Sequence, residues 1–321
     1  MSSEHQHVSL PHDPPPHDPL WPRASEWLAA GTRRWRENPE LVPTIGLLGV
    51  PAHLTSISAT NAHTTPAAVR EMLARYSVWA ESTGVDLRDM LAVDLGDVAD
   101  PDGPAGESRT ATTVAFWSGS LLIALGGDNS ITYAIATGVR ATGVVTLDAH
   151  HDLRDGASNG SPIQRVLADG FDGRRVVQVG ISDFANSPQY AARARNYGVT
   201  IIHRDEVESR GIEVVMANAL AIAAGDVDDP RIHVDLDVDV CDRSVVPACP
   251  AAAPGGLSAY QLRRATRVAG ADPRVVSIDL AEVDATADTA DGRTVRLVAL
   301  CVLEAAAGRG SPPPATLGED L

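Results

Sequence analysis

The sequence is poor in aromatic residues. Phe, Trp and Tyr make up only 4% of the 321 residues, although 44% of the chain is hydrophobic. Valine, leucine, isoleucine and alanine must therefore fill the interior. The apolar fraction is ample for one large core, and α/β chains of this length often fold as a single domain.

Positive charge is also scarce. The chain has 26 Lys and Arg against 42 Asp and Glu, a formal net charge of -16. A surface of this sign repels nucleic-acid phosphates and anionic lipids, so we expect neither nucleic acid nor membrane as a partner. Most of the excess acid should be solvated surface, but some carboxylates can gather as hard ligands for cations.

Disulfide, secretion and membrane signals are missing. Cys241, Cys249 and Cys301 form no CxxC pair, which favours free thiols in a reducing compartment. The N-terminal stretch lacks the basic start and apolar run of a signal peptide. The apolar stretch 295–307 contains Arg296 and Glu304 and falls short of the ~20 residues that span a bilayer. We therefore expect a soluble cytoplasmic protein.

The body of the chain alternates short apolar runs with helix-length segments, a pattern typical of a parallel sheet covered by helices on both faces. In such folds the binding crevice lies at the carboxyl ends of the strands. The Pro- and His-rich residues 1–22 and the stretch 309–321 are expected to be disordered tails around one domain, residues 23–308. The expected strands are 44–50, 120–127, 143–150, 175–181, 199–203, 232–238 and 275–283, and the expected helices are 65–78, 130–142, 188–197, 212–224 and 258–269.

Acidic residues and a histidine follow the apolar run GVVTL. Asp148, His150 and Asp152 stand at alternate positions, so they can leave the strand end on one side. A single Asp or His at such a place is more often a turn former. Three of them beside a core would be costly without a cation, which favours metal ligation over a plain turn.

A second acidic cluster occurs within an apolar strand. Asp235, Asp237 and Asp239 alternate with Val and Leu and so share one face. Like charges this close cannot all stay ionised in a dry site without a cation. Carboxylates with an imidazole suit Mn²⁺ better than a thiolate-preferring metal, so Cys241 and Cys249 are interpreted as packing residues. We expect both clusters to converge on one divalent-metal site.

A third motif, GGDNS at residues 126–130, lies where a strand turns into a helix. Its glycines permit a sharp turn, and Asp128 or Ser130 can cap the helix. Alone it could equally mark a phosphate loop in a nucleotide-binding protein. The absence of GxGxxG or GK[ST] makes that alternative weak.

Taken in order, the motifs resemble those of the ureohydrolase superfamily, which contains arginases, agmatinases and formimidoylglutamases. The matching segments are GGDNS (126–130), DAHHDLR (148–154), DLDVDVCDR (235–243) and SIDLAEVDA (277–285), and the resemblance spans roughly residues 44–305. It implies a three-layer α/β/α sandwich on a mostly parallel sheet of about eight strands. The family's D-x-D-x-x-D spacing is met by Asp237, Asp239 and Asp242, which leaves Asp235 in the family's usual Ser position.

The resemblance also implies a two-manganese site. Asp148 and Asp237 correspond to bridging carboxylates, His150 and Asp239 complete one ion, and Asp152 belongs to the other. Where the family has a second histidine this chain has Asn129, a neutral and weaker donor, so we expect one tight Mn²⁺ and one weak or absent. Glu282 corresponds to the acid that pairs with the substrate amidinium, and Asp152 is a candidate to relay a proton.

Among ureohydrolases the chain most resembles formimidoylglutamases, in its SNGSP loop (158–162), its DAHHDLR form and its PACPAAAPGG stretch (247–256). The implied activity is hydrolysis of the small-molecule amidine N-formimino-L-glutamate to glutamate and formamide, in histidine degradation. Arg154, Asn159 and Arg165 are candidates to bind its carboxylates, and for Arg154 a surface salt bridge is an equal alternative.

Two alternatives stay open. One is another ureohydrolase that acts on arginine, agmatine or a guanidino acid. The other is a metal-poor homologue that has lost catalysis and serves as a binding subunit, an idea motivated by Asn129. Family members commonly form homo-oligomers, and we expect one here.

Overall fold

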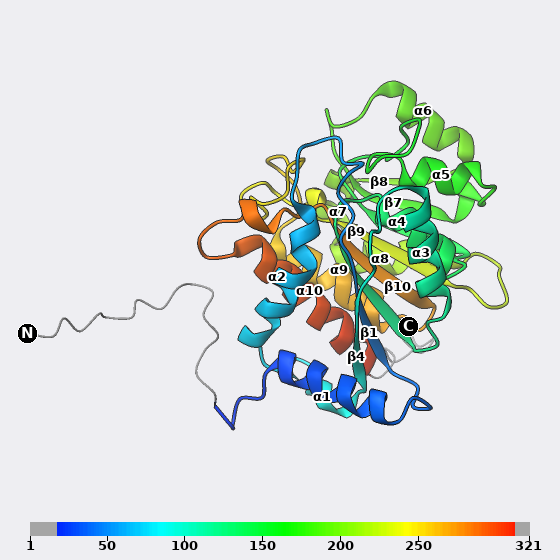
Figure 1. Ribbon diagram of the computed structural model, residues 1–321. Helices are drawn as coiled ribbons and strands as arrows, with labels where there is room; N and C mark the ends of the chain where they lie inside the picture. Colours follow the sequence, from blue (N-terminus) through cyan, green and yellow to red (C-terminus); the bar gives the residue numbers. More distant parts are fainter. Residues whose placement is uncertain (1–17, 312–321) are drawn as a thin grey trace, which may run out of the picture.

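The computed structural model describes residues 18–311. Eight parallel strands form one sheet in the order β4-β1-β5-β10-β9-β6-β7-β8 (Figure 1). Their bounds are β1 Ile45–Val50, β4 Ala92–Asp97, β5 Leu121–Gly126, β6 Gly143–Leu147, β7 Val176–Ile181, β8 Thr200–His203, β9 Ile232–Asp237 and β10 Val275–Ala281. A separate antiparallel hairpin pairs β2 (Trp79–Ala80) with β3 (Val85–Asp86).

Helices cover both faces of the sheet, which confirms the predicted three-layer α/β/α sandwich (Figure 1). One layer contains α2 Thr65–Met72, α7 Arg204–Arg210, α8 Ile212–Ala224, α9 Ala259–Ala271 and α10 Arg293–Gly310. The other contains α3 Gly103–Ala115, α4 Ile131–Gly138, α5 Pro162–Ala168 and α6 Pro188–Tyr197. Helix α1 (Ala24–Glu37) lies against the edge strand β4. Among the described residues no helix is both long and apolar enough to cross a membrane.

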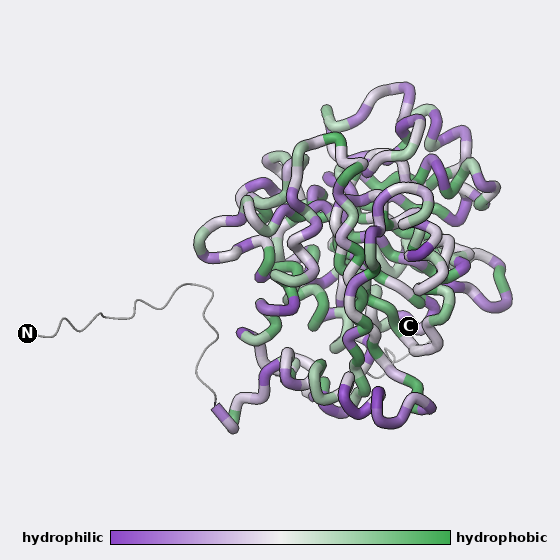
Figure 2. The backbone as a smooth tube through the Cα atoms, viewed as in Figure 1, coloured by the Kyte–Doolittle hydropathy of each residue, from purple (hydrophilic) through white to green (hydrophobic). Residues whose placement is uncertain are grey.

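The strands are apolar because both faces of the sheet are covered. β1, β5, β6, β7 and β9 are buried along their whole length. Aliphatic side chains supply most of this core, as the scarcity of aromatic residues requires. Figure 2 shows hydrophobic segments along the central strands and hydrophilic ones mainly on the outer loops and helices.

The predicted elements agree closely with the structure. All seven expected strands form, and the bounds of α6 and α8 match the predictions. The expected helix over 65–78 ends earlier, because α2 stops at Met72 and a short 3-10 turn, Leu73–Arg75, follows. Residues 309 and 310, assigned to the C-terminal tail, belong to α10. The other tail predictions, 1–17 and 312–321, lie outside the described residues.

Strand β9 carries the feature that positions the site. His233, Asp235 and Asp237 face the layer that contains α4, whereas Val234 and Leu236 belong to the apolar core on the opposite face. Asp235 is in register with Asp279 of β10 and with Thr146 of β6. Buried polar side chains therefore occupy one face of β9 and its neighbouring strands as far as the carboxyl ends of the strands.

The turn after β5 is packed too closely to accept a side chain at Gly127, and this predicts a loss of stability on substitution. Gly127 has a φ of +28°, and a Cβ there would lie 2.3 Å from the Ala52 oxygen and 2.7 Å from the Ala52 nitrogen. These are backbone atoms and cannot move cheaply, so Gly127→Ala should lower the free energy of unfolding by about 1–3 kcal/mol beyond strain alone. The control is Gly156→Ala, where φ is +90° but no atom lies within 4 Å. Urea unfolding of metal-free protein measures both, and equal losses would contradict the expectation.

Candidate metal and amidine site

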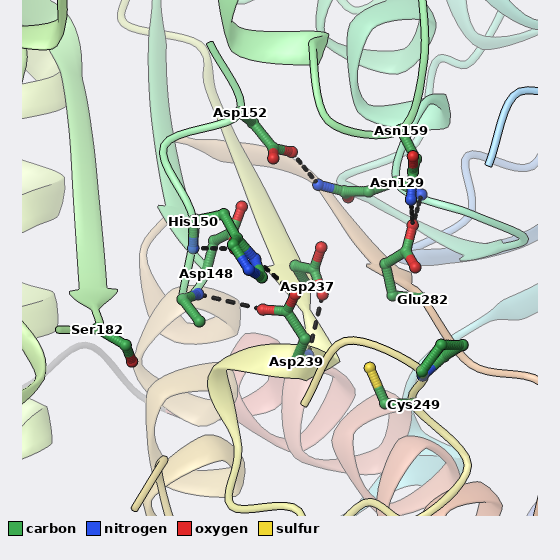
Figure 3. A network of polar contacts seen from close by, with 12 residues as sticks. Asn129, Asp148, His150, Asp152, Asn159, Ser182, Asp237, Asp239, Cys249 and Glu282 are labelled. Carbon is green, nitrogen blue, oxygen red and sulfur yellow. Dashed lines mark hydrogen bonds and ion pairs between the residues drawn. The ribbon is translucent and has the colours of Figure 1, made fainter. Parts of the chain in front are cut away.

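The two predicted acidic clusters meet at the carboxyl end of the sheet (Figure 3). β6 and β9 are neighbours, with Leu147 paired to Leu236. Because the two strands are parallel, the residues that follow this pair, Asp148 and Asp237, lie side by side. The loop after β6 adds His150 and Asp152, and the short 3-10 turn Val238–Val240 after β9 adds Asp239. The structure thus brings together the residues that the sequence assigned to one metal site.

Short hydrogen bonds fix this cluster. His150 Nδ1 lies 2.8 Å from Asp239 Oδ2 and 3.4 Å from Asp148 Oδ1. Backbone amides supply further donors, from His150 to Asp148 Oδ1 (2.6 Å), from Ala149 to Asp239 Oδ1 (3.1 Å) and from Asp239 to Asp237 Oδ1 (2.9 Å). The loop backbone therefore orients the carboxylates before any ligand arrives.

Burial sets the electrostatics of the cluster. It raises the pKa of Asp148 and Asp237 well above the usual range, and the neighbouring carboxylates, Asp239 among them, raise it further. Burial also raises the pKa of Asp152 to about 7, against the opposing charge of His150. Burial alone would lower the pKa of His150, but hydrogen bonds to Asp148 and Asp239 raise it to about 12. Excess negative charge here calls for protons or a cation.

The donor set fits a hard divalent cation. Two groups of three ligand atoms each lie within 4.8 Å of one another and share Asp148; we call them the His150 group (Asp148, His150, Asp239) and the Asp152 group (Asp148, Asp152, Asp237). Asp148 is 1% exposed, yet its Oδ2 has no hydrogen-bond partner among the described residues. Carboxylate oxygens with one imidazole suit Mn²⁺, and neither group includes a cysteine.

Glu282 lies across from the cluster at the end of β10. It has a φ of +66°, and its backbone amide donates to the Gly127 oxygen at 2.9 Å. Its Oε1 accepts from the Asn129 backbone amide (2.8 Å) and from Asn159 Nδ2 (2.7 Å). Burial raises the pKa of Glu282 to about 8, although these two hydrogen bonds oppose the shift. The carboxyl is thus held in one orientation while Oε2 is not used by either bond.

Asn129 contacts the cluster through its side chain. Its Nδ2 donates to Asp152 Oδ2 at 2.8 Å, while its Oδ1 lies 3.1 Å from the Thr132 hydroxyl. The side chain is 1% exposed. The predicted candidate ligand is therefore adjacent to the Asp152 group, with its amide nitrogen rather than its oxygen toward Asp152.

A cavity of about 290 Å³ opens beside the cluster, and Arg154 lines it together with His150, Asp152, Asn159 and Glu282. The Arg154 side chain crosses Gly160, where a Cβ would lie 2.7 Å from Arg154 Cδ. The Arg154 guanidinium makes no hydrogen bond or ion pair with any described residue, but its charge opposes the rise in the pKa of Asp152.

Arg165 was expected to bind substrate, and this expectation is wrong. Its guanidinium makes a two-pronged ion pair with Glu107, at 2.6 Å for each bond, and stacks on Tyr133 at 3.8 Å. The Nη1 and Nη2 edge of the guanidinium is occupied by Glu107, and the residue does not line the cavity beside Glu282. It holds helices α3, α4 and α5 together instead.

A buried network beneath the cluster was missed by the sequence analysis. Asp279 of β10, Thr132 of α4 and His233 of β9 are all 0% exposed. The Thr132 hydroxyl lies 3.0 Å from Asp279 Oδ2, and His233 Nε2 lies 3.3 Å from the same oxygen. The available signal was the three-residue spacing of Asn129 and Thr132, which puts both on one side of a helix start. Asp235, left without a role, is also fully buried here.

Comparison with known proteins places the chain among ureohydrolases. The arginase family model matches residues 43–308. A formimidoylglutamase of Halalkalibacterium halodurans is 34% identical over 76% of this chain and 80% of its own. One of Bacillus subtilis is 34% identical over 83% of this chain and 88% of its own.

Solved structures agree. The crystal structure of formimidoylglutamase from Bacillus subtilis matches with a TM-score of 0.83 and 29% identity, covering 93% of this chain and 95% of that one. A Trypanosoma cruzi formiminoglutamase with Mn²⁺ matches with a TM-score of 0.81, covering 91% of this chain and 100% of that one; at 21% identity it shows the common fold alone. With the family model spanning nearly the whole described sandwich, the chain belongs to the arginase family.

Proposed function

We propose that this protein is a manganese-dependent hydrolase of linear amidines, and that its substrate is N-formimino-L-glutamate, cleaved to L-glutamate and formamide. One observation carries the proposal: the acidic cluster with His150, the buried acid Glu282 and the guanidinium of Arg154, which has no ion-pair partner among the described residues, line one cavity. The formimidoylglutamases at 34% identity support this choice of substrate. We place the activity in one cytoplasmic catalytic domain, residues 23–308, that forms a homo-oligomer.

The His150 group and the Asp152 group would each hold one Mn²⁺, with Asp148 common to both. When bound, Mn²⁺ lowers the pKa of a coordinated water and so supplies a nucleophile near neutral pH. Asn129 would complete the Asp152 group. An amide oxygen is a weaker donor than imidazole, so we assign the tight ion to the His150 group and the weak one to the Asp152 group.

Glu282 would bind the amidine. Both hydrogen bonds to its side chain among the described residues end on Oε1, which leaves Oε2 for an amidinium N–H. Asn159 is already engaged with Glu282, so its role is to orient this acid rather than to bind a substrate carboxylate. Such orientation fixes the formimino carbon relative to the cluster and lowers the entropic barrier to attack.

Asp152 would move the proton. In the hydrolysis, a water oxygen bonds to the formimino carbon, the bond from that carbon to the glutamate nitrogen breaks, and the nitrogen gains a proton to leave as an amine. Asp152 borders the cavity and belongs to the cluster, so it can take a proton from water and pass it to the departing nitrogen.

Arg154 would bind a substrate carboxylate. A guanidinium can bond a carboxylate through two parallel N–H groups, and this one forms no ion pair with a described acid, although its charge acts on Asp152. It also gives an acidic protein a local positive charge at the mouth of the cavity. Arginine and agmatine, whose far ends carry a cationic centre or lack a second carboxylate, would gain less from it.

Two alternatives remain testable. Another ureohydrolase would share the cluster and Glu282 but release urea from a guanidine. A catalytically weakened binding subunit would keep the fold, and Asn129 is the residue that motivates this alternative.

The substrate proposal is tested by loading the protein with Mn²⁺ and assaying formiminoglutamate, arginine and agmatine side by side. We expect formamide from the first and little or no urea from the others, because only the first offers a formimino carbon and two carboxylates. Metal content is counted in the same samples. Urea as the main product would favour another ureohydrolase. No turnover despite bound metal would contradict the proposal that the protein is an enzyme.

Arg154→Ala is expected to raise KM for formiminoglutamate by roughly tenfold or more, because one charge-assisted hydrogen-bonding pair is lost. Arg165→Ala is the matched control: its guanidinium is held by Glu107, so it should reduce stability and leave KM nearly unchanged. Steady-state kinetics and thermal unfolding separate the two effects. Equal KM for Arg154→Ala and the native protein would remove Arg154 from the binding site.

Manganese titration tests whether the two groups bind Mn²⁺ with unequal affinity. Calorimetry and metal counting after dialysis should reveal one ion that is retained and a second that is lost. Asn129→His should strengthen the second ion, because imidazole is a better donor, while the first ion changes little. Two stoichiometric ions held equally tightly by the native protein would contradict the assignment of a weak Asp152 group.

A further inference from the structure

The Thr132 hydroxyl occupies a position between the site and the buried network. It lies 3.1 Å from Asn129 Oδ1 on one side and 3.0 Å from Asp279 Oδ2 on the other. Thr132 is 0% exposed and stands in the first turn of α4. Water therefore does not reach it from bulk solvent, and its bonding must be satisfied by these neighbours.

The hydroxyl has one proton for two oxygen neighbours. A threonine hydroxyl donates once and accepts through two lone pairs, whereas an ionised carboxylate only accepts. A carboxylate is also the stronger acceptor, because charge-assisted hydrogen bonds are roughly twice as strong as neutral ones. The proton of Thr132 should therefore point to Asp279, and a lone pair should point to Asn129.

His233 is the next side chain beside Asp279. Its Nε2 lies 3.3 Å from Asp279 Oδ2 but is not aligned for a hydrogen bond, whereas its Nδ1 lies 2.8 Å from the Ser277 hydroxyl. The hydrogen bond that reaches Asp279 Oδ2 is therefore the one from Thr132. All three side chains are 0% exposed.

This polarity decides which end of the Asn129 amide faces the cluster. The oxygen and nitrogen of an amide have nearly the same shape, so their assignment follows from the hydrogen bonds around them. A lone pair on Thr132 needs the amide NH₂ opposite it. The amide oxygen then turns to Asp152 Oδ2, where two oxygens would repel each other unless a cation lies between them.

We propose that Thr132 is a positioning residue that, through its hydrogen bond to Asp279, turns the Asn129 amide oxygen toward the Asp152 group. The inference rests on the proposed metal site, because a cation must bind there to favour this orientation. It assigns the hydrogen-bonded pair of Thr132 and Asp279 a role in metal affinity. The bond from Asn129 Nδ2 to Asp152 Oδ2 represents the other orientation of the same amide.

The test compares Mn²⁺ binding by Thr132→Val, which removes the hydroxyl at nearly constant shape, with Thr132→Ser, which keeps it. Loss of an outer-shell partner typically costs 10–100-fold in metal affinity. We expect Thr132→Val to weaken the second ion by roughly tenfold or more and to leave the first unchanged, and Thr132→Ser to restore the native value. Thr137→Val is the control, because its hydroxyl bonds only the Tyr133 oxygen of the same helix.

A double-mutant cycle shows whether the effect passes through the amide. In an Asn129→Ala background, Thr132→Val should have no further effect on the second ion. Thermal unfolding of each metal-free variant reports whether it folds. If Thr132→Val does not fold, a structure of the native protein with Mn²⁺ still decides, because Asn129 Oδ1 must face the ion and Nδ2 must face Thr132.

Several outcomes would overturn the inference. These are an unchanged second ion in Thr132→Val, an equal loss in the Asn129→Ala background, an amide nitrogen facing the ion, or no second ion in the native protein at any Mn²⁺ concentration. None of them decides whether formiminoglutamate is hydrolysed, because formamide release is assayed separately from binding of the second ion. Conversely, a protein that binds two ions as expected but hydrolyses no amidine would defeat the proposed function and leave the role of Thr132 standing.

Discussion

Four aspartates buried at the ends of two neighbouring strands impose the constraint on which the site depends. Asp148, Asp237 and Asp239 are each at most 3% exposed, and Asp152 is 8% exposed. Removing carboxylates from water costs several kcal/mol each, and backbone N–H donors orient them without cancelling their charge. The fold meets this constraint by placing β6 beside β9, so that one cation can serve carboxylates from both strands.

The same constraint extends into the interior. On the face that α4 covers, β9 presents His233, Asp235 and Asp237, and β10 presents Ser277 and Asp279. The apolar core of that face is accordingly split in two: one cluster lies over β1 and β5, and the other over β6 and β7. The opposite face has one continuous core. Stability is thus concentrated on one side of the sheet, and the polar network on the other supports the site.

The sequence predicted the central strands, the layer architecture and the residues of the cluster. These are governed by local patterns: apolar runs define buried strands, and alternation sends Asp148 and Asp237 to one edge. The edge strand β4 was missed because its sequence, AVDLGD, is acidic and only half buried. Helix α3 was missed because Gly, Thr and Ala give it no clear apolar face.

Contacts between segments that are far apart in the chain could not be predicted from the sequence. Arg165 pairs with Glu107, 58 residues away, and no local pattern reveals that its guanidinium is already engaged. The role of Asp279 beneath the site depends on helix α4 lying over β10, which brings Thr132 to within 3.0 Å. The orientation of the Asn129 amide likewise follows from hydrogen-bond partners that only the tertiary structure assembles.

Charge balance explains why a neutral asparagine can stand where the family has a histidine. A neutral imidazole and an amide carry the same charge, so the exchange leaves the negative charge of Asp148, Asp152, Asp237 and Asp239 unaltered. What changes is donor strength and competition. Asn129 Nδ2 bonds Asp152 Oδ2, so the amide must turn before its oxygen can serve the Asp152 group as a ligand. In the His150 group the competitor is a proton, because hydrogen bonds to Asp148 and Asp239 raise the pKa of His150 to about 12 and Nδ1 must lose that proton before it can ligate an ion. The two groups therefore differ in what must change: an amide must turn in one, and an imidazole must lose a proton in the other.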